Sequence, residues 1–135
     1  MTRHNVPPFN KRGKNERKRA HFIGRRAEWL TMGWLMCQGY RLLAHNLRLP
    51  QGEIDLVMRR GDLLIFIEVK YRADNLPIGA SVSPQQWRRI AACAAQYVGR
   101  HQALQQCQWR FDQFLWRPWR WPQHRKNVWR VSGGL

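Results

Sequence analysis

The sequence predicts one mixed α/β domain with a central β-sheet flanked by helices. Two segments, residues 24–37 and 84–98, carry apolar side chains at the spacing of amphipathic helices. Four short apolar runs bounded by turn residues, at 40–46, 53–58, 63–70 and 109–116, are typical of strands. The resulting α-β-β-β-α-β order favours an α/β fold, and 135 residues suit a single domain.

Each predicted helix has a recognisable boundary. Gly39 is a suitable stop for the first helix, and Glu28 borders its apolar stripe of Ala27, Leu30, Trp34 and Leu35. A loop is expected over residues 72–83, where Gly, Pro and Ser are frequent. Ser83 then caps the second helix, with Pro84 at its first position and Gln86 at the capping-box position. The apolar face of this helix consists of Trp87, Ile90, Ala91, Ala94, Tyr97 and Val98.

A two-residue turn at Gly61 and Asp62 sets the register of the hairpin that joins the second and third strands. With glycine first, as in a type II′ turn, Arg60 faces Leu63. A slip of one residue would expose the apolar set, so the register is well determined. One face of the hairpin is then apolar throughout, with Ile54, Leu56, Met58, Ile65, Ile67 and Val69.

The same register opposes acidic side chains at the end of the hairpin farthest from the turn. Asp55 faces Glu68, and Glu53 faces Lys70, all on one face. Two opposed carboxylates repel each other, and burying them is costly unless a cation compensates. Oxygen ligands with room for water suit Mg²⁺ or Mn²⁺, and Lys70 can favour deprotonation of a water. The pattern predicts metal-assisted phosphodiester hydrolysis; the alternative is a set of solvated or salt-bridged strand-end residues.

Strong positive charge indicates a polyanionic partner. The chain has 24 Lys and Arg against 8 Asp and Glu, a formal net charge of +16. Arg pairs with phosphates and stacks on bases, which favours nucleic acid. An anionic membrane surface is disfavoured, because no basic amphipathic helix of sufficient length is present. Arg88 and Arg89, off the apolar face of the second helix, are candidate phosphate contacts as well as ordinary solvated residues.

The two ends of the chain differ in composition from residues 22–116, which we predict to form the domain. Residues 1–21 are basic and nearly free of apolar side chains, as in a disordered arm. Residues 117–135 alternate Trp with Arg and contain two prolines, so a tail without regular structure is expected. The late tryptophans either cover the sheet edge or stack on unpaired bases: Trp109, Trp116, Trp119, Trp121 and Trp129.

Cysteine usage and the absence of apolar runs predict a soluble cytoplasmic protein. Cys37, Cys93 and Cys107 are odd in number and widely spaced, so we expect reduced core residues rather than disulfides or a zinc site. The basic N-terminus lacks the apolar region of a signal peptide. No segment approaches the ~18 apolar residues of a membrane span.

A family resemblance agrees with this interpretation. Asp55, followed on the next strand by Glu68-Val69-Lys70, resembles the Asp…Glu-x-Lys core of restriction-endonuclease-like nucleases. More specifically, the motifs GEIDL and FIEVKYR within residues 24–98 resemble the bacterial YraN family, whose core is similar to that of archaeal Holliday-junction resolvases.

The resemblance implies a restriction-endonuclease-like fold and a Mg²⁺- or Mn²⁺-dependent nuclease acting on DNA, including branched or recombination-related DNA. It implies Asp55 and Glu68 as metal ligands and Lys70 as the catalytic lysine. Glu28 would complete the ligand set, and Arg25 and Arg72 would lie near the substrate, whereas Glu53 has a less defined role. Related resolvases dimerise to cut two strands, so the resemblance is also compatible with a homodimer.

Two departures from this expectation are visible in the sequence. Gln113 interrupts the apolar run at residues 109–116 and weakens the prediction of a fourth strand there, and the Trp-rich ending is unfamiliar in the family. Two other functions fit the same charge: a nucleic-acid-binding protein that keeps the fold without cleavage, and a protein that binds structured RNA.

Overall fold

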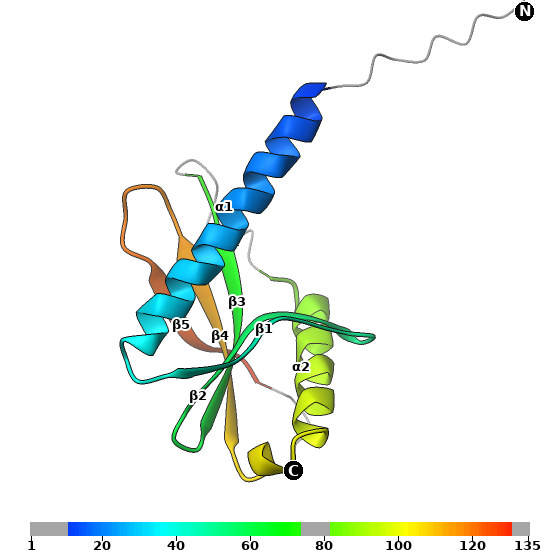
Figure 1. The fold of residues 1–135 in the computed structure, drawn as a ribbon. Helices are drawn as coiled ribbons and strands as arrows, with labels where there is room; N and C mark the ends of the chain where they lie inside the picture. Colours follow the sequence, from blue (N-terminus) through cyan, green and yellow to red (C-terminus); the bar gives the residue numbers. More distant parts are fainter. Residues whose placement is uncertain (1–10, 74–81, 131–135) are drawn as a thin grey trace, which may run out of the picture.

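A five-stranded mixed sheet with one helix on each face forms the protein (Figure 1). In the computed structural model, residues 11–73 and 82–130 are described, with side chains from residue 23 onward. The elements are α1 (Lys11–Met36), β1 (Arg41–Leu49), β2 (Gly52–Arg60), β3 (Leu63–Tyr71), α2 (Pro84–Gly99), a 3₁₀ turn η1 (Gln102–Leu104), β4 (Gln108–Trp116) and β5 (Gln123–Trp129). The predicted α/β class is therefore confirmed.

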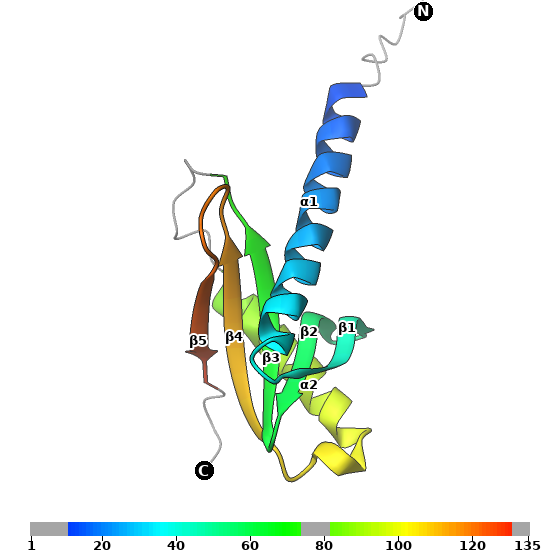
Figure 2. The ribbon, with the colours of Figure 1, turned by 60° about the vertical axis from the view of Figure 1, so that its left-hand side comes forward.

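The strands follow one another across the sheet in the order β1-β2-β3-β4-β5, and only β3 and β4 are parallel. A parallel pair needs a long crossover, which α2 provides. Figure 2 shows α1 and α2 on opposite faces of the sheet. One buried cluster, including Phe66 and Trp87, packs under α2, and a second, including Leu35 and Phe114, packs under α1. No helix in the described part of the chain is long and apolar enough to cross a membrane.

The β2–β3 hairpin has the predicted register. Its pairs run from Arg60↔Leu63 to Leu56↔Ile67, and Gly61 has a φ of 59°, as the first position of a type II′ turn requires. Beyond Leu56↔Ile67 no further backbone pair forms, so the two strands part at the predicted pair of Asp55 and Glu68.

The prediction of one apolar face needs a correction at Ile54. The other five residues of that face pack under α1, but Ile54 joins the cluster under α2. Asn46 lies between the pairs His45↔Leu56 and Leu47↔Ile54, and its φ of 50° is left-handed. A backbone turn at this point accounts for the change of face, and Figure 1 shows the β1–β2 hairpin curving toward α2.

Several element boundaries differ from the prediction. Helix α1 begins at Lys11 rather than residue 24, so the helix includes residues 11–21 of the expected arm. The first two strands, predicted over residues 40–46 and 53–58, are separated only by a short turn at Pro50 and Gln51, because β1 continues to Leu49 and β2 begins at Gly52. Most of the predicted loop at 72–83 lies outside the described residues. The division of the chain at residues 21 and 116 stays a prediction, although secondary structure continues across both positions.

The fourth strand forms despite Gln113, and a fifth strand that we did not predict follows it. Gln113 is buried and lies beside Glu68 in the parallel β3–β4 ladder. β5 pairs antiparallel with β4, so residues 123–129 are regular structure rather than tail. Pro118 and Pro122 lie in the connection before β5, where they remove no ladder hydrogen bond.

Asp112 anchors β5 to β4. The β4–β5 register is irregular next to this residue, and the Asn127 N–H donates to Asp112 Oδ1 at 3.0 Å in place of a ladder bond. His124 Nε2 lies 2.8 Å from Asp112 Oδ2, and Arg110 donates through both Nε and Nη2. Burial alone would raise the pKa of Asp112, but the hydrogen bonds from His124, Arg110 and Asn127 outweigh it and lower the pKa. The carboxyl group is completely buried, and its lowered pKa keeps it ionised at neutral pH.

The start of α2 agrees with its predicted cap. Ser83 Oγ accepts a hydrogen bond from the Gln86 N–H at 3.2 Å, and Pro84 occupies the first turn. We expect Ser83→Ala to lower the free energy of unfolding by ~1 kcal/mol, because one helix N–H loses its partner. Urea denaturation measures this loss, and Ser83→Asp, which restores an acceptor, should recover it. A Ser83→Ala variant as stable as wild type would contradict the cap.

The cysteines are free, as expected, but not all lie in the core. Cys93 is fully buried under α2 and Cys107 is half-buried, whereas Cys37 is exposed at the end of α1. The prediction of three core cysteines was therefore wrong for Cys37, because α1 ends just before this residue and leaves it outside the helix–sheet contact.

Candidate active site

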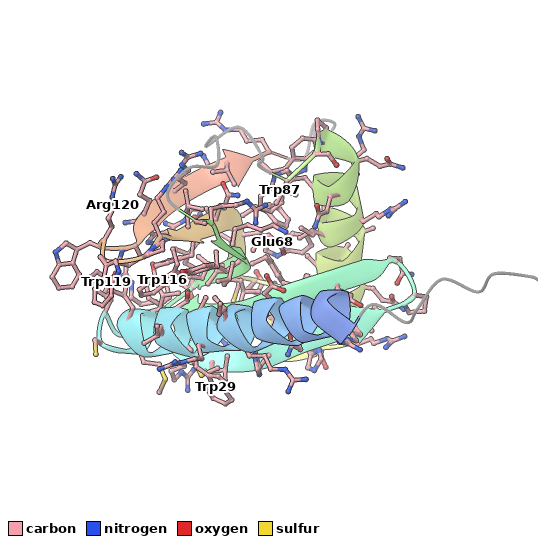
Figure 3. The ribbon with its side chains drawn as sticks, turned by 90° about the horizontal axis from the view of Figure 1, so that it is seen from above. Trp29, Glu68, Trp87, Trp116, Trp119 and Arg120 are labelled. Carbon is pink, nitrogen blue, oxygen red and sulfur yellow. The ribbon has the colours of Figure 1, made fainter. Side chains whose placement is uncertain are left out.

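The predicted acidic pair and its lysine come together where β2 and β3 part. Asp55 Oδ2 accepts a hydrogen bond from the backbone N–H of Val69 at 2.8 Å, so the carboxylate occupies the place of a ladder partner. Glu68 Oε1 lies 3.2 Å from Lys70 Nζ on the same strand. Figure 3 shows Glu68 in the space between α1 and α2. The local end of strand pairing thus turns Asp55 toward β3 instead of toward solvent.

Glu68 is enclosed by polar groups from two elements. Its side chain is 8% exposed, against 25% for Lys70. Gln86 Nε2 donates to Glu68 Oε1 at 3.3 Å. The Gln86 backbone N–H donates to Ser83, as the predicted capping box requires, whereas the Gln86 side-chain amide donates to Glu68. The first turn of α2 therefore helps position this carboxylate.

Both carboxyl groups have raised pKa values. Burial is the main cause for Asp55, followed by the charge of Glu68, and its pKa rises to about 8 although the Val69 N–H lowers it. Burial also raises the pKa of Glu68, against the opposing effect of Lys70. The two groups share a hydrogen bond, and the charge of Glu28 raises the pKa of each. Without a cation, the pair therefore retains a proton near neutral pH.

This shift predicts a pH-dependent stability. The Asp55 pKa is 3.8 in its ordinary state and about 8 in the fold, so the folded protein binds more protons between these values and its stability falls as the pH rises through them. Asn cannot lose a proton, so Asp55→Asn in EDTA should be more stable than wild type at pH 8. Each pKa unit is worth about 1.4 kcal/mol, and local relaxation reduces the total, so we expect ~2–4 kcal/mol.

Urea denaturation at pH 4 and pH 8 measures this difference, which should nearly vanish at pH 4. Glu53→Gln removes a carboxylate from the same strand outside the pair and serves as the control. Equal stability of Asp55→Asn and wild type at pH 8 in EDTA would contradict the raised pKa.

Glu28 lies near the pair but has a partner of its own. Its Oε2 is 2.8 Å from His45 Nε2, and the His45 ring contacts Trp29 at 5.1 Å between centroids. Residues 28 and 45 belong to different elements, so no local pattern in the sequence predicts this contact. Glu28 as a metal ligand stays a prediction.

The donor set fits a hard divalent cation that keeps several waters. Asp55 and Glu68 offer carboxylate oxygens at one point, and their mutual repulsion is the feature that a divalent charge would relieve. Within the described residues, no three His, Cys, Asp or Glu side chains are already placed to hold a metal. Mg²⁺ commonly uses one or two carboxylates and water, so a two-carboxylate site suits Mg²⁺ or Mn²⁺.

The remaining predicted site residues are Glu53 and four arginines. Glu53 was expected opposite Lys70 but pairs with Arg48 at 3.7 Å, where both side chains are about 70% exposed. Arg72 follows β3, and its N–H donates to the Trp116 carbonyl at 2.9 Å. The arginines Arg25 on α1 and Arg88 and Arg89 on α2 are exposed. Their contact with nucleic acid stays a prediction.

The cluster lies within the part of the chain that matches a known family. Residues 27–115 match the model of the uncharacterised protein family UPF0102. The chain belongs to this family. A UPF0102 protein of Maricaulis maris is 47% identical over 113 residues, covering 84% of this chain and 89% of that protein. UPF0102 proteins of Mesorhizobium japonicum and Brucella canis are 41% and 43% identical, covering 83% and 81% of this chain and 90% and 87% of theirs.

The segment that matches the UPF0102 model contains the candidate site residues but not β5. Glu28, Asp55, Glu68 and Lys70 all fall within residues 27–115, whereas β5 and the loop before it follow the matched segment. UPF0102 is the YraN family, which the GEIDL and FIEVKYR motifs resemble. The predicted resemblance is therefore confirmed.

Proposed function

We propose that this UPF0102 protein is a metal-dependent nuclease that hydrolyses phosphodiester bonds in DNA. The observation that carries the proposal is the convergence of Asp55 and Glu68, both with raised pKa values, beside Lys70. A structural salt bridge would need one acid and one base, and a second buried carboxylate has no stabilising role in it. Two carboxylates and a lysine match the requirements of metal-assisted hydrolysis.

Each residue has a distinct role in this proposal. Asp55 and Glu68 would hold a Mg²⁺ or Mn²⁺ ion, which supplies Lewis acidity and neutralises charge on the phosphate. The Val69 N–H fixes the Asp55 carboxylate, and Gln86 fixes Glu68. Lys70, held by Glu68, orients the attacking water and stabilises the negative charge that develops during attack. Glu28 adds negative charge that strengthens cation binding, and His45 holds it in place.

The surroundings support a nucleic-acid substrate. The net charge of +16 concentrates a polyanion, and the acidic cluster is a small negative region within that field. DNA rather than RNA follows from the resemblance to restriction-endonuclease-like nucleases and junction resolvases. Branched DNA and a homodimer belong to the same proposal.

A cleavage screen tests the function. Purified protein is incubated with linear duplex, single-stranded, flapped and four-way-junction DNA, with Mg²⁺, Mn²⁺ or EDTA. We expect cleavage of at least one DNA with Mg²⁺ or Mn²⁺ and none with EDTA. If no DNA is cut with either metal, the nuclease proposal is wrong.

One observation favours a second function, nucleic-acid binding without cleavage. Lys70 and Gln86 already compensate Glu68 without a metal, so the site can be stable as a salt bridge. In that case, binding in EDTA would be tight and salt-sensitive, and Glu68→Ala would leave the affinity unchanged. Competition between DNA and structured RNA at fixed salt would then identify the preferred ligand.

A further inference from the structure

A groove lined by Trp and Arg side chains opens next to α1. It has a volume of about 640 Å³ and lies between α1, the end of β3 and the loop of residues 117–122 that joins β4 to β5. We name it the Trp–Arg groove after its principal lining residues, Arg26, Tyr71, Trp116, Arg117, Trp119 and Arg120. Figure 3 shows Trp116, Trp119 and Arg120 gathered toward one end of α1, apart from Glu68.

Two of the rings that line the groove, Trp116 and Trp121, are held by contacts with α1. Trp116 Nε1 donates to Thr31 Oγ1 at 2.7 Å, and the buried Thr31 hydroxyl donates to the Ala27 carbonyl at 2.7 Å. Trp121, which also lines the groove, lies against Trp34, with 5.7 Å between ring centroids. Aromatic surface that is fixed before binding lowers the entropy cost of holding a ligand.

Trp119 contributes nothing to the folded core. Its relative exposure is 101%, and its φ of 59° is a left-handed conformation that a bulky residue rarely adopts. Folding of this chain alone therefore does not explain why a large aromatic ring stands at this position. A ring with both faces open is suited to stacking on a flat ligand.

The charge around the groove selects the occupant. Arg26, Arg117 and Arg120 line it, in a chain of net charge +16. A second copy docked on the same patch would bring these arginines against their equivalents, because a two-fold interface contacts itself. A polyanion has the opposite charge, and unpaired bases expose the flat faces that Trp and Arg stack upon. The bases of an intact duplex are already stacked on one another.

We propose that the Trp–Arg groove binds unpaired nucleotides of a single-stranded DNA segment, with a base stacked on Trp119. The choice of DNA over RNA rests on the proposed function, whereas stacking of unpaired bases rests on the groove itself.

Fluorescence anisotropy in EDTA tests this inference without requiring cleavage. The probes are fluorescein-labelled oligothymidylate, a blunt duplex of the same length, and oligouridylate. Trp119→Ala should weaken oligothymidylate binding by about 5- to 50-fold and duplex binding by less than about 2-fold, as expected for the loss of one base-stacking contact. Because Trp119 is completely exposed, the variant should fold like wild type.

Trp109→Phe is the matched control, since it removes a tryptophan at the opposite end of β4 and keeps the aromatic contact with Phe66. The control should bind both DNA probes like wild type. The inference is overturned if Trp119→Ala binds oligothymidylate like wild type or weakens both DNA probes equally. Sedimentation showing a dimer that Trp119→Ala dissociates, with unchanged DNA affinity, would instead assign the groove to a second copy.

Oligouridylate binding about tenfold tighter than oligothymidylate would overturn the choice of DNA, since each tenfold in Kd is a 1.4 kcal/mol preference. If no DNA is cleaved but Trp119→Ala still weakens oligothymidylate binding, the nuclease proposal is wrong and the groove proposal stands. The two proposals can therefore fail separately.

Discussion

Asp55→Asn is expected to lower metal-dependent DNA cleavage by at least ~100-fold, the loss typical when one group that stabilises transition-state charge is removed. The substitution keeps the shape of the side chain but removes the charge that would bind the cation. The Asp55 carboxylate accepts the Val69 N–H, and burial and Glu68 raise its pKa to about 8. It is therefore held in place at an energetic cost that a bound cation would remove.

Lys70→Met should cause a loss of similar size by a different route. Lys70 Nζ lies 3.2 Å from Glu68, and Met retains the length of the side chain without the charge. Cation binding should persist in this variant, because both carboxylates remain. Initial cleavage rates over a range of Mn²⁺ concentrations distinguish the two effects: Lys70→Met lowers the maximal rate, whereas Asp55→Asn also raises the Mn²⁺ concentration required.

Glu53→Gln is the matched control for both variants. Glu53 belongs to the same GEIDL motif as Asp55, but its side chain is about 70% exposed and pairs with Arg48. We expect its cleavage rate to stay within about 3-fold of wild type, as is usual for a surface ion pair. The Asp55–Glu68 pair is not the catalytic centre if Asp55→Asn cleaves DNA as fast as wild type. The same conclusion follows if Glu53→Gln loses as much cleavage rate as Asp55→Asn.

Asp112→Asn is expected to have the largest effect on stability, a loss of ~3–5 kcal/mol, as is typical when one member of a buried ion pair is removed. Asp112 is completely buried and accepts hydrogen bonds from Arg110, His124 and the Asn127 N–H. Asn offers one acceptor oxygen and places an NH₂ group against donors. The Arg110 guanidinium would then be left largely buried without its counter-charge.

Urea denaturation at pH 7 and pH 3 measures this loss. The Asp112 pKa lies below its ordinary value of 3.8, so the stabilisation is present above that pH and disappears as the pH falls through the lowered value. The gap between wild type and variant should therefore narrow at pH 3. Asp62→Asn, an acidic-to-amide change at the exposed turn, is the control and should be nearly neutral. An Asp112→Asn protein as stable as this control would contradict the proposed network.

Most of the correct predictions from the sequence depend on residues that are close together in the chain. The Gly61 turn fixed the hairpin register, because the pairing of two adjacent strands depends only on the residues between them. The position of Asp55 near Glu68 and Lys70 followed from that register. Ser83 and Pro84 likewise located the start of α2 through local backbone chemistry.

Contacts between distant segments were not predictable in the same way. His45 meets Glu28 across 17 positions, and Gln86 meets Glu68 across 18. β5 was missed because its residues 123–129 are polar and basic, with burial that alternates poorly. Its pairing depends on Asp112 from the neighbouring strand rather than on its own pattern.

The sequence by itself determined the α/β class, the hairpin, the acidic pair beside Lys70 and the net charge of +16, on which the proposal of a polyanionic partner rests. Each of these depends on local periodicity, a turn or a total charge. Only the tertiary structure decided that the strands part at Asp55, that Gln86 and His45 support the carboxylates, and that the 117–122 loop lies against α1 to form the Trp–Arg groove. These features arise from packing between elements far apart in the chain, which no local pattern of residues records.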